Sequence, residues 1–192
     1  KISDQKNTLI NIVRNTGFYF AEIETKIEDN NNNSVNIIYN FILGERAKIS
    51  EIKFIGNKIF KNNKLRNIIV SEENRPWKFI TSNKYLSESR IKLDINLLKN
   101  YFKNKGYYNA LIKSSSAKVI DSNNFVLTFN IDSGDRYYFN NINLEVSEDY
   151  KKENFSNFFK IFNELKGKPY SLNSIKKIIN EIDKTALQKE FV

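Results

Sequence analysis

The sequence predicts an α+β fold made of tandem repeats, each with the element order β-α-α-β-β. In each repeat we expect a three-stranded mixed sheet that is covered on one face by two antiparallel helices. Three observations lead to this prediction: blocks of residues recur with a period of about 90, amphipathic helical stripes alternate with strand-like segments, and 40% of the 192 residues are hydrophobic. A chain of this length and composition can bury a substantial core.

The repeat is clearest around the glycines. Gly17-Phe18-Tyr19-Phe20-Ala21 recurs 89 residues later as Gly106-Tyr107-Tyr108-Asn109-Ala110, and Gly44-Glu45-Arg46 recurs 90 residues later as Gly134-Asp135-Arg136. Apolar positions and turn lengths agree between the copies as well. The two glycine-acid-arginine junctions therefore divide the chain into the C-terminal part of one repeat, a complete repeat and the N-terminal part of a third, at residues 1–44, 45–134 and 135–192.

Each element of the complete repeat follows from its local pattern. Ile52 and Phe54 alternate with charged neighbours, which predicts a strand, and the stripe Ile91, Ile95, Leu98 and Phe102 has the spacing of one helix face. The final strand is more apolar than the strand before it, so we expect the final strand at the centre of the sheet and its predecessor at an edge. The expected order is a strand at 48–56, a short helix from Asn62 or Asn63 through Ile69, a helix at 87–104 that stops at Gly106, the edge strand at 107–119 and the central strand at 125–132.

The flanking segments match parts of this unit. Residues 1–44 fit a helix followed by two strands, and residues 135–192 fit a strand at 136–146, a helix at about 152–164, a break at 167–170 and a final helix carrying Ile175, Ile178, Ile179 and Ile182. Both chain ends then fall inside repeats, and the sequence contains no Met. We therefore expect the chain to be a piece of a longer protein.

The composition argues against catalysis. Because the sequence has no His and no Cys, a Ser-His-Asp triad, a thiolate nucleophile, a conventional zinc site and a disulfide are excluded. No phosphate-binding glycine motif is present, and no run approaches the ~20 apolar residues of a membrane helix. We expect no enzyme activity, no metal and no cofactor. The carboxylates of Asp94 and Asp132 are the remaining enzymatic alternative, and both are interpreted as isolated helix-surface and strand-end residues.

The excess of positive over negative charge lies in the complete repeat. The chain has a net charge of +9, and residues 45–134 carry 17 basic and 8 acidic side chains, which accounts for all of it. Lys92, Lys99 and Lys103 share a helix face, so a nucleic-acid or other anionic partner is an alternative function. A solvated lysine face is the favoured interpretation, because 30 Asn and 25 Lys are what an A+T-rich coding sequence tends to produce. No nucleic-acid partner is expected.

These patterns resemble the POTRA domains of Omp85-superfamily proteins. Besides the two junctions, the stretch Ile52-Lys53-Phe54-Ile55-Gly56-Asn57 resembles the family's first-strand pattern I-x-F-x-G-N. Arg75-Pro76-Trp77-Lys78-Phe79, followed by Tyr85, Leu97-Leu98, Tyr101 and Gly106-Tyr107, is similar to the third POTRA domain of the bacterial outer-membrane assembly factor of this superfamily. The resemblance covers nearly the whole chain, as the end of a second, the whole of a third and most of a fourth POTRA domain.

The resemblance implies binding rather than chemistry. POTRA arrays of the assembly factor lie in the periplasm, N-terminal to a membrane β-barrel that the full-length protein is expected to carry. They receive unfolded outer-membrane proteins and dock accessory lipoproteins of the assembly machinery. Members of the superfamily in two-partner secretion, organelle protein import and cell division are alternatives within the family.

Two surfaces are candidates for binding. An exposed edge strand offers unpaired backbone groups to an extended client, so the first candidate is the edge strand with Tyr107, Tyr108, Ala110 and Ile112. The two tyrosines have an alternative role in packing the core and the junction. The second candidate surface lies beside the short helix, around Ile68, Ile69 and Trp77. For Trp77 itself we favour a buried plug between the helices.

The junctions are expected to control the spacing of the repeats. They are so short that neighbouring repeats must touch, which limits swivelling. Their charged residues are expected to pair across the junction as orienting contacts of at most about 1 kcal/mol. The junction residues are Gly44, Glu45, Arg46, Gly134, Asp135 and Arg136.

Overall fold

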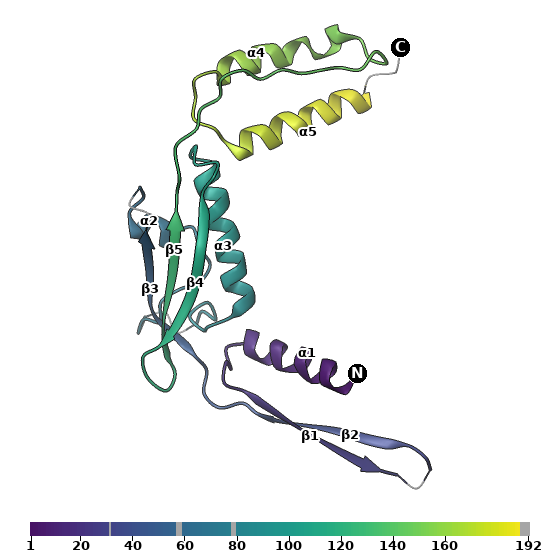
Figure 1. The fold of residues 1–192 in the computed structure, drawn as a ribbon, viewed down its shortest axis with the longest axis vertical. Helices are drawn as coiled ribbons and strands as arrows, with labels where there is room; N and C mark the ends of the chain where they lie inside the picture. Colours follow the sequence, from purple (N-terminus) through teal and green to yellow (C-terminus); the bar gives the residue numbers. More distant parts are fainter. Residues whose placement is uncertain (31, 57–58, 78–79, 189–192) are drawn as a thin grey trace. The chain divides into compact units, whose positions relative to one another are not determined.

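The computed structural model describes residues 1–30, 32–56, 59–77 and 80–188, so Asn57, Lys78 and Phe79 of the family patterns lie outside the described residues. The chain forms two compact units, one of residues 1–98 with 112–131 and one of residues 99–111 with 132–192. In the described ranges no helix is long and apolar enough to cross a membrane. The elements in Figure 1 are α1 (Ile2–Asn15), β1 (Glu22–Asp29), β2 (Val35–Ile42), β3 (Lys48–Gly56), α2 (Asn62–Arg66), α3 (Glu88–Lys103), β4 (Leu111–Val119), β5 (Asn124–Asp132), the 3₁₀ turn η1 (Lys152–Phe155), α4 (Ser156–Leu165) and α5 (Leu172–Gln188).

The middle of the chain forms the predicted three-stranded mixed sheet. Its strand order is β3-β5-β4, so the final strand of the repeat is central and its predecessor lies at an edge, as predicted. β3 runs parallel to β5, from Lys48 opposite Asn124 to Gly56 opposite Ile131, with a shift of register between Ile49 and Glu51. β4 and β5 form a hairpin that is closed by the hydrogen bond from Ile120 N to Asn124 O, at 2.9 Å.

One face of this sheet is covered and the other is open to solvent. Along β5 the buried residues alternate with half-buried ones, and the buried set is Phe125, Leu127, Phe129 and Ile131. Leu65 of α2 and Leu98 of α3 are completely buried. This alternation is typical of a sheet with helices on a single face, and it confirms the predicted α+β architecture.

β4 is shorter than predicted. The sequence pattern suggested a strand from residue 107, but β4 begins at Leu111, so the first four residues of the predicted strand are not part of it. Instead the chain turns there, because Tyr108 N donates to Gly106 O and Ala110 N donates to Tyr107 O, both at 3.1 Å. Backbone groups that are used in a turn cannot join a ladder.

Residues 1–44 have the predicted order of a helix and two strands. β1 and β2 pair antiparallel, from Glu22 opposite Ile42 to Asp29 opposite Val35, as a two-stranded sheet. Val35 and Phe41 of β2, which match Phe125 and Ile131 of β5 in the repeat, are 53% and 41% exposed, whereas their counterparts are 2% exposed or less. This difference in exposure accompanies a difference in position: β5 lies between two strands, whereas β2 pairs with one strand among the described residues.

In residues 135–192 the helices are confirmed and the strand is not. η1 with α4 occupies the predicted helix at 152–164, and α5 follows the break at 167–170. The predicted strand at 136–146 is wrong: its only bridge among the described residues joins Tyr138 to Pro169. β3 obtains its ladder from β5, and no described strand offers such a ladder to residues 136–146. The helices are instead held by a core of Phe155, Phe158, Phe162 and Ile178.

Candidate functional site

The candidate binding feature is the outer edge of β4. β4 is the last strand in the sheet order, so its outer edge has no neighbouring strand in the part of the chain that is described. The centre of β4 is Ser114-Ser115-Ser116-Ala117, and all nine residues of the strand are exposed or half-buried. Small side chains leave the backbone of an edge accessible, and an edge of this kind can accept another strand.

Only one of the predicted edge residues lies in this strand. Ile112 is in β4 and is half-buried, whereas Tyr107, Tyr108 and Ala110 precede it. Tyr107 is buried and its ring lies edge-on to Phe102, with the ring centroids 6.0 Å apart. Ala110 is buried as well. Their position favours the packing role that the sequence left open for the tyrosines.

Tyr108 belongs to an aromatic cluster at the second junction. Its ring lies edge-on to Tyr170 at 5.1 Å and to Tyr137 at 6.2 Å between centroids. The Lys103 ammonium lies 5.5 Å from the Tyr108 ring centroid. Burial and the neighbouring Tyr108 raise the pKa of Tyr170. Half of Tyr108 remains exposed, so the cluster forms part of the surface of this unit.

The second predicted surface contains a groove of about 700 Å³. Ile69 and Trp77 line it together with Arg66, Glu73 and Arg75, whereas Ile68 does not. The prediction that Trp77 is a buried plug is wrong. Its side chain is 68% exposed and lies under the Arg75 guanidinium, 5.7 Å from the ring centroid. The reason is the surface turn at Pro76 and Trp77, which carries the indole away from the core.

Both junctions are closed by the same backbone contact. Ala47 N donates to Gly17 O, and Tyr137 N donates to Gly106 O, each at 2.8 Å. Gly17 and Gly106 correspond in the repeat, and so do the two donors. In each of the two units, the carbonyl of the glycine that follows a long helix therefore accepts a hydrogen bond from a residue just after a junction.

An asparagine two residues before each glycine makes a second matching contact. Asn15 Oδ1 accepts a hydrogen bond from Ser89 N at the start of α3, at 3.1 Å, and Asn104 Oδ1 accepts one from Asn173 N at the start of α5, at 2.7 Å. The first backbone N–H groups of a helix have no partner within the helix, so each asparagine caps a long helix of the following repeat. These two asparagines were not among the predicted functional residues, although Asn-x-Gly recurs at the 89-residue offset.

The charged junction residues do not pair as predicted. In the described ranges none of Glu45, Arg46, Asp135 and Arg136 forms an ion pair, and Glu45 instead accepts a hydrogen bond from the Asn123 side chain. Arg46 lies between two rings, 4.9 Å from each of the Phe18 and Tyr85 centroids. Arg136 lies over Tyr138 and donates from Nε to Lys105 O at 3.2 Å. Planar guanidinium groups stack on aromatic rings, and here the rings replace the predicted carboxylates.

Replacing Gly17 with alanine is expected to lower the free energy of unfolding by about 2 kcal/mol or more. Gly17 has a φ of 104°, and an added Cβ would lie 2.7 Å from Tyr85 Cβ, which cannot yield without moving the backbone. Gly44→Ala is the matched control, since Gly44 has a φ of 65° but no atom within 4 Å of the added Cβ. Urea unfolding should show roughly 1 kcal/mol for the control. Equal losses in the two variants would mean that the contact with Tyr85 is unimportant.

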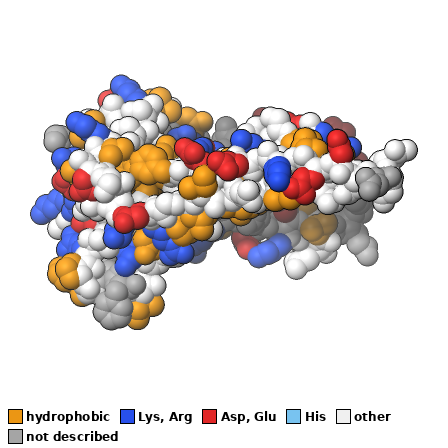
Figure 2. Space-filling model, turned by 90° about the horizontal axis from the view of Figure 1, so that it is seen from below, with side chains coloured by type: hydrophobic (Ala, Val, Ile, Leu, Met, Phe, Trp, Pro, Cys, Tyr) orange, Lys and Arg blue, Asp and Glu red, His pale blue; other side chains and the backbone are white. Residues whose placement is uncertain are grey.

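Two lysines of the predicted face and the Asp132 carboxylate have contacts within the chain. Lys92 pairs with Glu88 at 2.7 Å, and Lys103 lies over Tyr108. On the face drawn in Figure 2, basic side chains are interspersed with acidic and hydrophobic ones. Asp132 is the predicted strand-end residue, and its Oδ1 accepts a hydrogen bond from Gly134 N at 3.2 Å.

The interpretation of Asp94 as a helix-surface residue is wrong. Its side chain is 0% exposed, and Oδ1 accepts hydrogen bonds from Val70 N at 2.6 Å and Ser71 N at 3.3 Å. Burial raises the pKa of Asp94, although the hydrogen bonds oppose that effect. The sequence carried a signal for this, because Asp94 falls three residues after Ile91 and four before Leu98, inside the apolar stripe.

Comparison with known proteins agrees with this fold. Residues 47–134 match the model of the POTRA family, which is described as surface antigen variable number repeat. The chain is 22% identical over 125 residues to the outer membrane protein assembly factor BamA of Neisseria meningitidis serogroup B, covering 65% of this chain and 16% of that protein. It is 25% identical over 111 residues to BamA of Buchnera aphidicola, covering 57% and 18%. The chain thus spans less than a fifth of the length of these relatives.

A solved structure has a similar fold. The crystal structure of Haemophilus influenzae BamA POTRA3-5 superposes with a TM-score of 0.58 at 18% identity, covering 96% of this chain and 69% of that one. The element order, the sheet order and the family match all coincide on the middle of the chain. Residues 47–134 are therefore a POTRA domain, and the chain as a whole is similar to the POTRA regions of BamA proteins.

Proposed function

We propose that this chain is a periplasmic, non-catalytic scaffold in the assembly of outer-membrane β-barrel proteins. In this role it binds unfolded outer-membrane protein clients by strand addition and docks accessory lipoproteins. The names of the relatives, which are outer membrane protein assembly factors, support the process. Residues 1–44, 45–134 and 135–192 are also proposed as the C-terminal part of one POTRA repeat, a complete repeat and the N-terminal part of a third.

The observation that carries the proposal is the free outer edge of β4. A client strand that pairs with β4 would form main-chain hydrogen bonds, which are independent of side-chain identity and suit many different clients. Leu111 and Ile112 supply apolar side chains at the start of the strand, and the four small residues after Lys113 keep the backbone open. We therefore place the client on Leu111–Val119.

The groove beside α2 is proposed as the second partner surface. An exposed tryptophan at a groove is the kind of residue that dominates protein interfaces, and Trp77 is 68% exposed next to Ile69. A folded accessory partner fits such a surface better than an extended strand does, because the groove offers side chains instead of a free ladder. Trp77→Ala should weaken lipoprotein binding and leave client binding unchanged.

NMR titration of the isotopically labelled chain tests the client site. A peptide from the C-terminal strand of an outer-membrane protein should shift the amide signals of Leu111–Val119, with little change between low and high salt, because backbone pairing is weakly screened. A nonspecific oligonucleotide is titrated in parallel. Oligonucleotide shifts along Lys92, Lys99 and Lys103 that vanish in salt, without any peptide response, would contradict strand addition and favour the anionic-partner alternative.

A further inference from the structure

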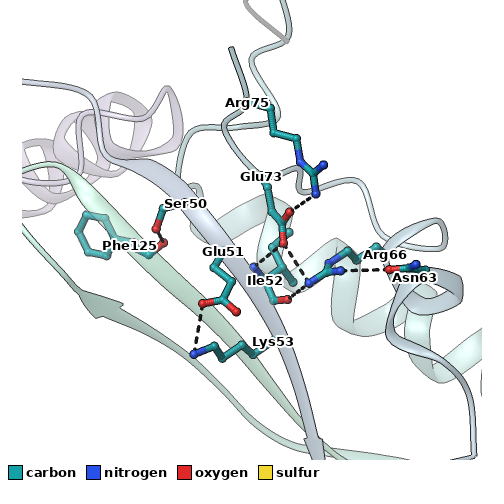
Figure 3. A network of polar contacts seen from close by, with 9 residues as sticks. All are labelled: Ser50, Glu51, Ile52, Lys53, Asn63, Arg66, Glu73, Arg75 and Phe125. Carbon is teal, nitrogen blue, oxygen red and sulfur yellow. Dashed lines mark hydrogen bonds and ion pairs between the residues drawn. The ribbon is translucent and has the colours of Figure 1, made fainter. Parts of the chain in front are cut away.

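The sheet has a second edge, β3, and outward backbone groups in the first half of this strand are already occupied. Ile52 N donates to Glu73 Oε1 at 3.0 Å, and Arg66 Nη2 donates to Ile52 O at 2.9 Å. Figure 3 shows the carboxylate and the guanidinium lying along β3, on the side away from β5. One donor and one acceptor of the edge are thus satisfied by two side chains, in the way that a neighbouring strand would satisfy them.

The chain itself occupies the preceding outward position. Asn74 N donates to Ile49 O at 2.6 Å, and Ile49 N donates to Lys84 O at 2.8 Å. An added strand needs a run of free N–H and C=O groups at alternate residues. With Ile49 and Ile52 both engaged, β3 offers no such run over the first half of its length.

An ion-pair network holds the two guarding side chains in place. Glu73 pairs with Arg66 at 3.1 Å and with Arg75 at 2.7 Å, and Arg66 Nη1 donates to Asn63 Oδ1 at 3.2 Å (Figure 3). Burial raises the pKa of Glu73, but hydrogen bonds from Arg75 and Ile52 N, with the charges of both arginines, outweigh it and lower the pKa below 4.5. The carboxylate is therefore ionised at neutral pH, although its side chain is only 11% exposed.

A half-buried charge has a desolvation cost that a surface position would not have. The ion pair of Glu51 with Lys53, on the same strand, shows that a charge here does not have to contact the backbone. Charged side chains directed at an edge are a known means of preventing unwanted strand pairing. The position of Glu73 and Arg66 on the outward backbone groups of Ile52 fits that purpose.

We propose that Glu73 and Arg66 form an edge guard, which closes β3 to added strands and so restricts strand addition on this sheet to β4. The guard itself follows from the contacts at Ile52, and its effect on clients rests on the proposed function. The alternative is that the two residues merely anchor the segment between α2 and α3. Anchoring alone would not change where an added strand binds.

Glu73→Ala in the 192-residue chain tests the guard, and Glu51→Ala is the matched control. Glu51 is on β3 and carries the same charge, but its carboxylate contacts Lys53 instead of backbone. In Glu73→Ala we expect the Ile52 amide to exchange with solvent about tenfold faster, which corresponds to the loss of one hydrogen bond. Titrated with the same client peptide, this variant should show new shifts at Ile52 and Phe54, and the control should show none.

The outcomes separate the guard from the proposed function. Shifts on β4 alone in the unmodified chain, with added shifts on β3 in Glu73→Ala, support both. Shifts only on β3 of Glu73→Ala, with no response in the unmodified chain, support the guard and contradict client capture by β4. The guard is overturned if Glu73→Ala folds, the peptide causes no shifts on β3, and the Ile52 amide exchanges no faster than in the unmodified chain.

A second variant covers loss of folding. Glu73→Gln keeps an oxygen that accepts the Ile52 N–H and loses the charge that attracts Arg66 and Arg75. It should expose Ile52 to exchange less than Glu73→Ala does, with weaker shifts on β3. If Glu73→Ala does not fold, Glu73→Gln decides the question: no change at Ile52 and no binding at β3 would overturn the guard.

Discussion

Replacing Asp94 with alanine is expected to lower the free energy of unfolding by about 3 kcal/mol. The side chain is fully buried in α3, and its carboxylate satisfies the backbone N–H groups of Val70 and Ser71 after α2. Alanine leaves both donors without an acceptor in a region from which water is excluded, and it leaves a small cavity as well. Urea unfolding monitored by circular dichroism measures the loss.

Asp94→Asn is the control that separates the hydrogen bonds from the charge. An asparagine oxygen still accepts a hydrogen bond, so most of the stability should remain. A loss in Asp94→Asn as large as that in Asp94→Ala would mean that the negative charge matters more than the acceptor. A loss below about 1 kcal/mol in Asp94→Ala would contradict the capping role altogether.

Because the pKa of Asp94 is raised in the folded state, the free energy of unfolding depends on pH, and the direction of that dependence can be predicted. A carboxyl whose pKa is higher in the folded than in the unfolded state binds more protons when folded, so its contribution to stability rises as the pH falls from the folded pKa toward 3.8. Asp94→Asn lacks this titration. The unmodified chain should therefore gain stability relative to Asp94→Asn over that window, and a constant difference would contradict the raised pKa.

Proline substitutions in β4 are expected to have the largest effect on client binding. Successive residues of a strand direct their N–H groups alternately toward the partner strand and away from it. Of Ser115→Pro and Ser116→Pro, one therefore removes a donor from the ladder with β5 and the other removes a donor from the free edge. The free-edge variant should lose client binding by at least about tenfold and keep its stability within ~1 kcal/mol.

The other proline variant is its matched control. It should be destabilised, because a ladder hydrogen bond is lost within the sheet, and where it remains folded it should still bind. Ser115→Ala and Ser116→Ala should change neither property, since strand addition depends on the backbone. Unchanged peptide affinity in both folded proline variants, measured by NMR titration, would contradict strand addition at β4.

Under the proposed function, the contrast between the two edges of the sheet accounts for client binding to a single strand. β3 and β4 are both edge strands, and their side-chain surroundings differ. On β3 the backbone at Ile52 is engaged by Glu73 and Arg66, whereas β4 has serines and an alanine at its centre. A free edge is an aggregation hazard unless it is controlled, and closing one edge leaves the other for function.

The sequence by itself determined the order of the elements and the repeat. Alternation at Ile52 and Phe54 and the helical stripe through Leu98 and Phe102 are local periodicities, and the structure confirms β3 and α3 within one or two residues of the predicted bounds. The apolar character of β5 sufficed to place that strand at the centre of the sheet. Such features depend on residues close together in the chain, which is why a pattern can predict them.

Only the tertiary structure decided which backbone and polar groups find partners. The turn at 107–110 replaces the start of the predicted strand, and residues 136–146 have no described strand to pair with. Asp94 reaches Val70 across 24 positions of sequence, and Glu73 reaches Ile52 across 21. A hydrogen bond between distant segments depends on how those segments pack, so a local sequence pattern cannot predict it. The free edge of β4 and the guarded edge of β3 therefore became visible only in three dimensions.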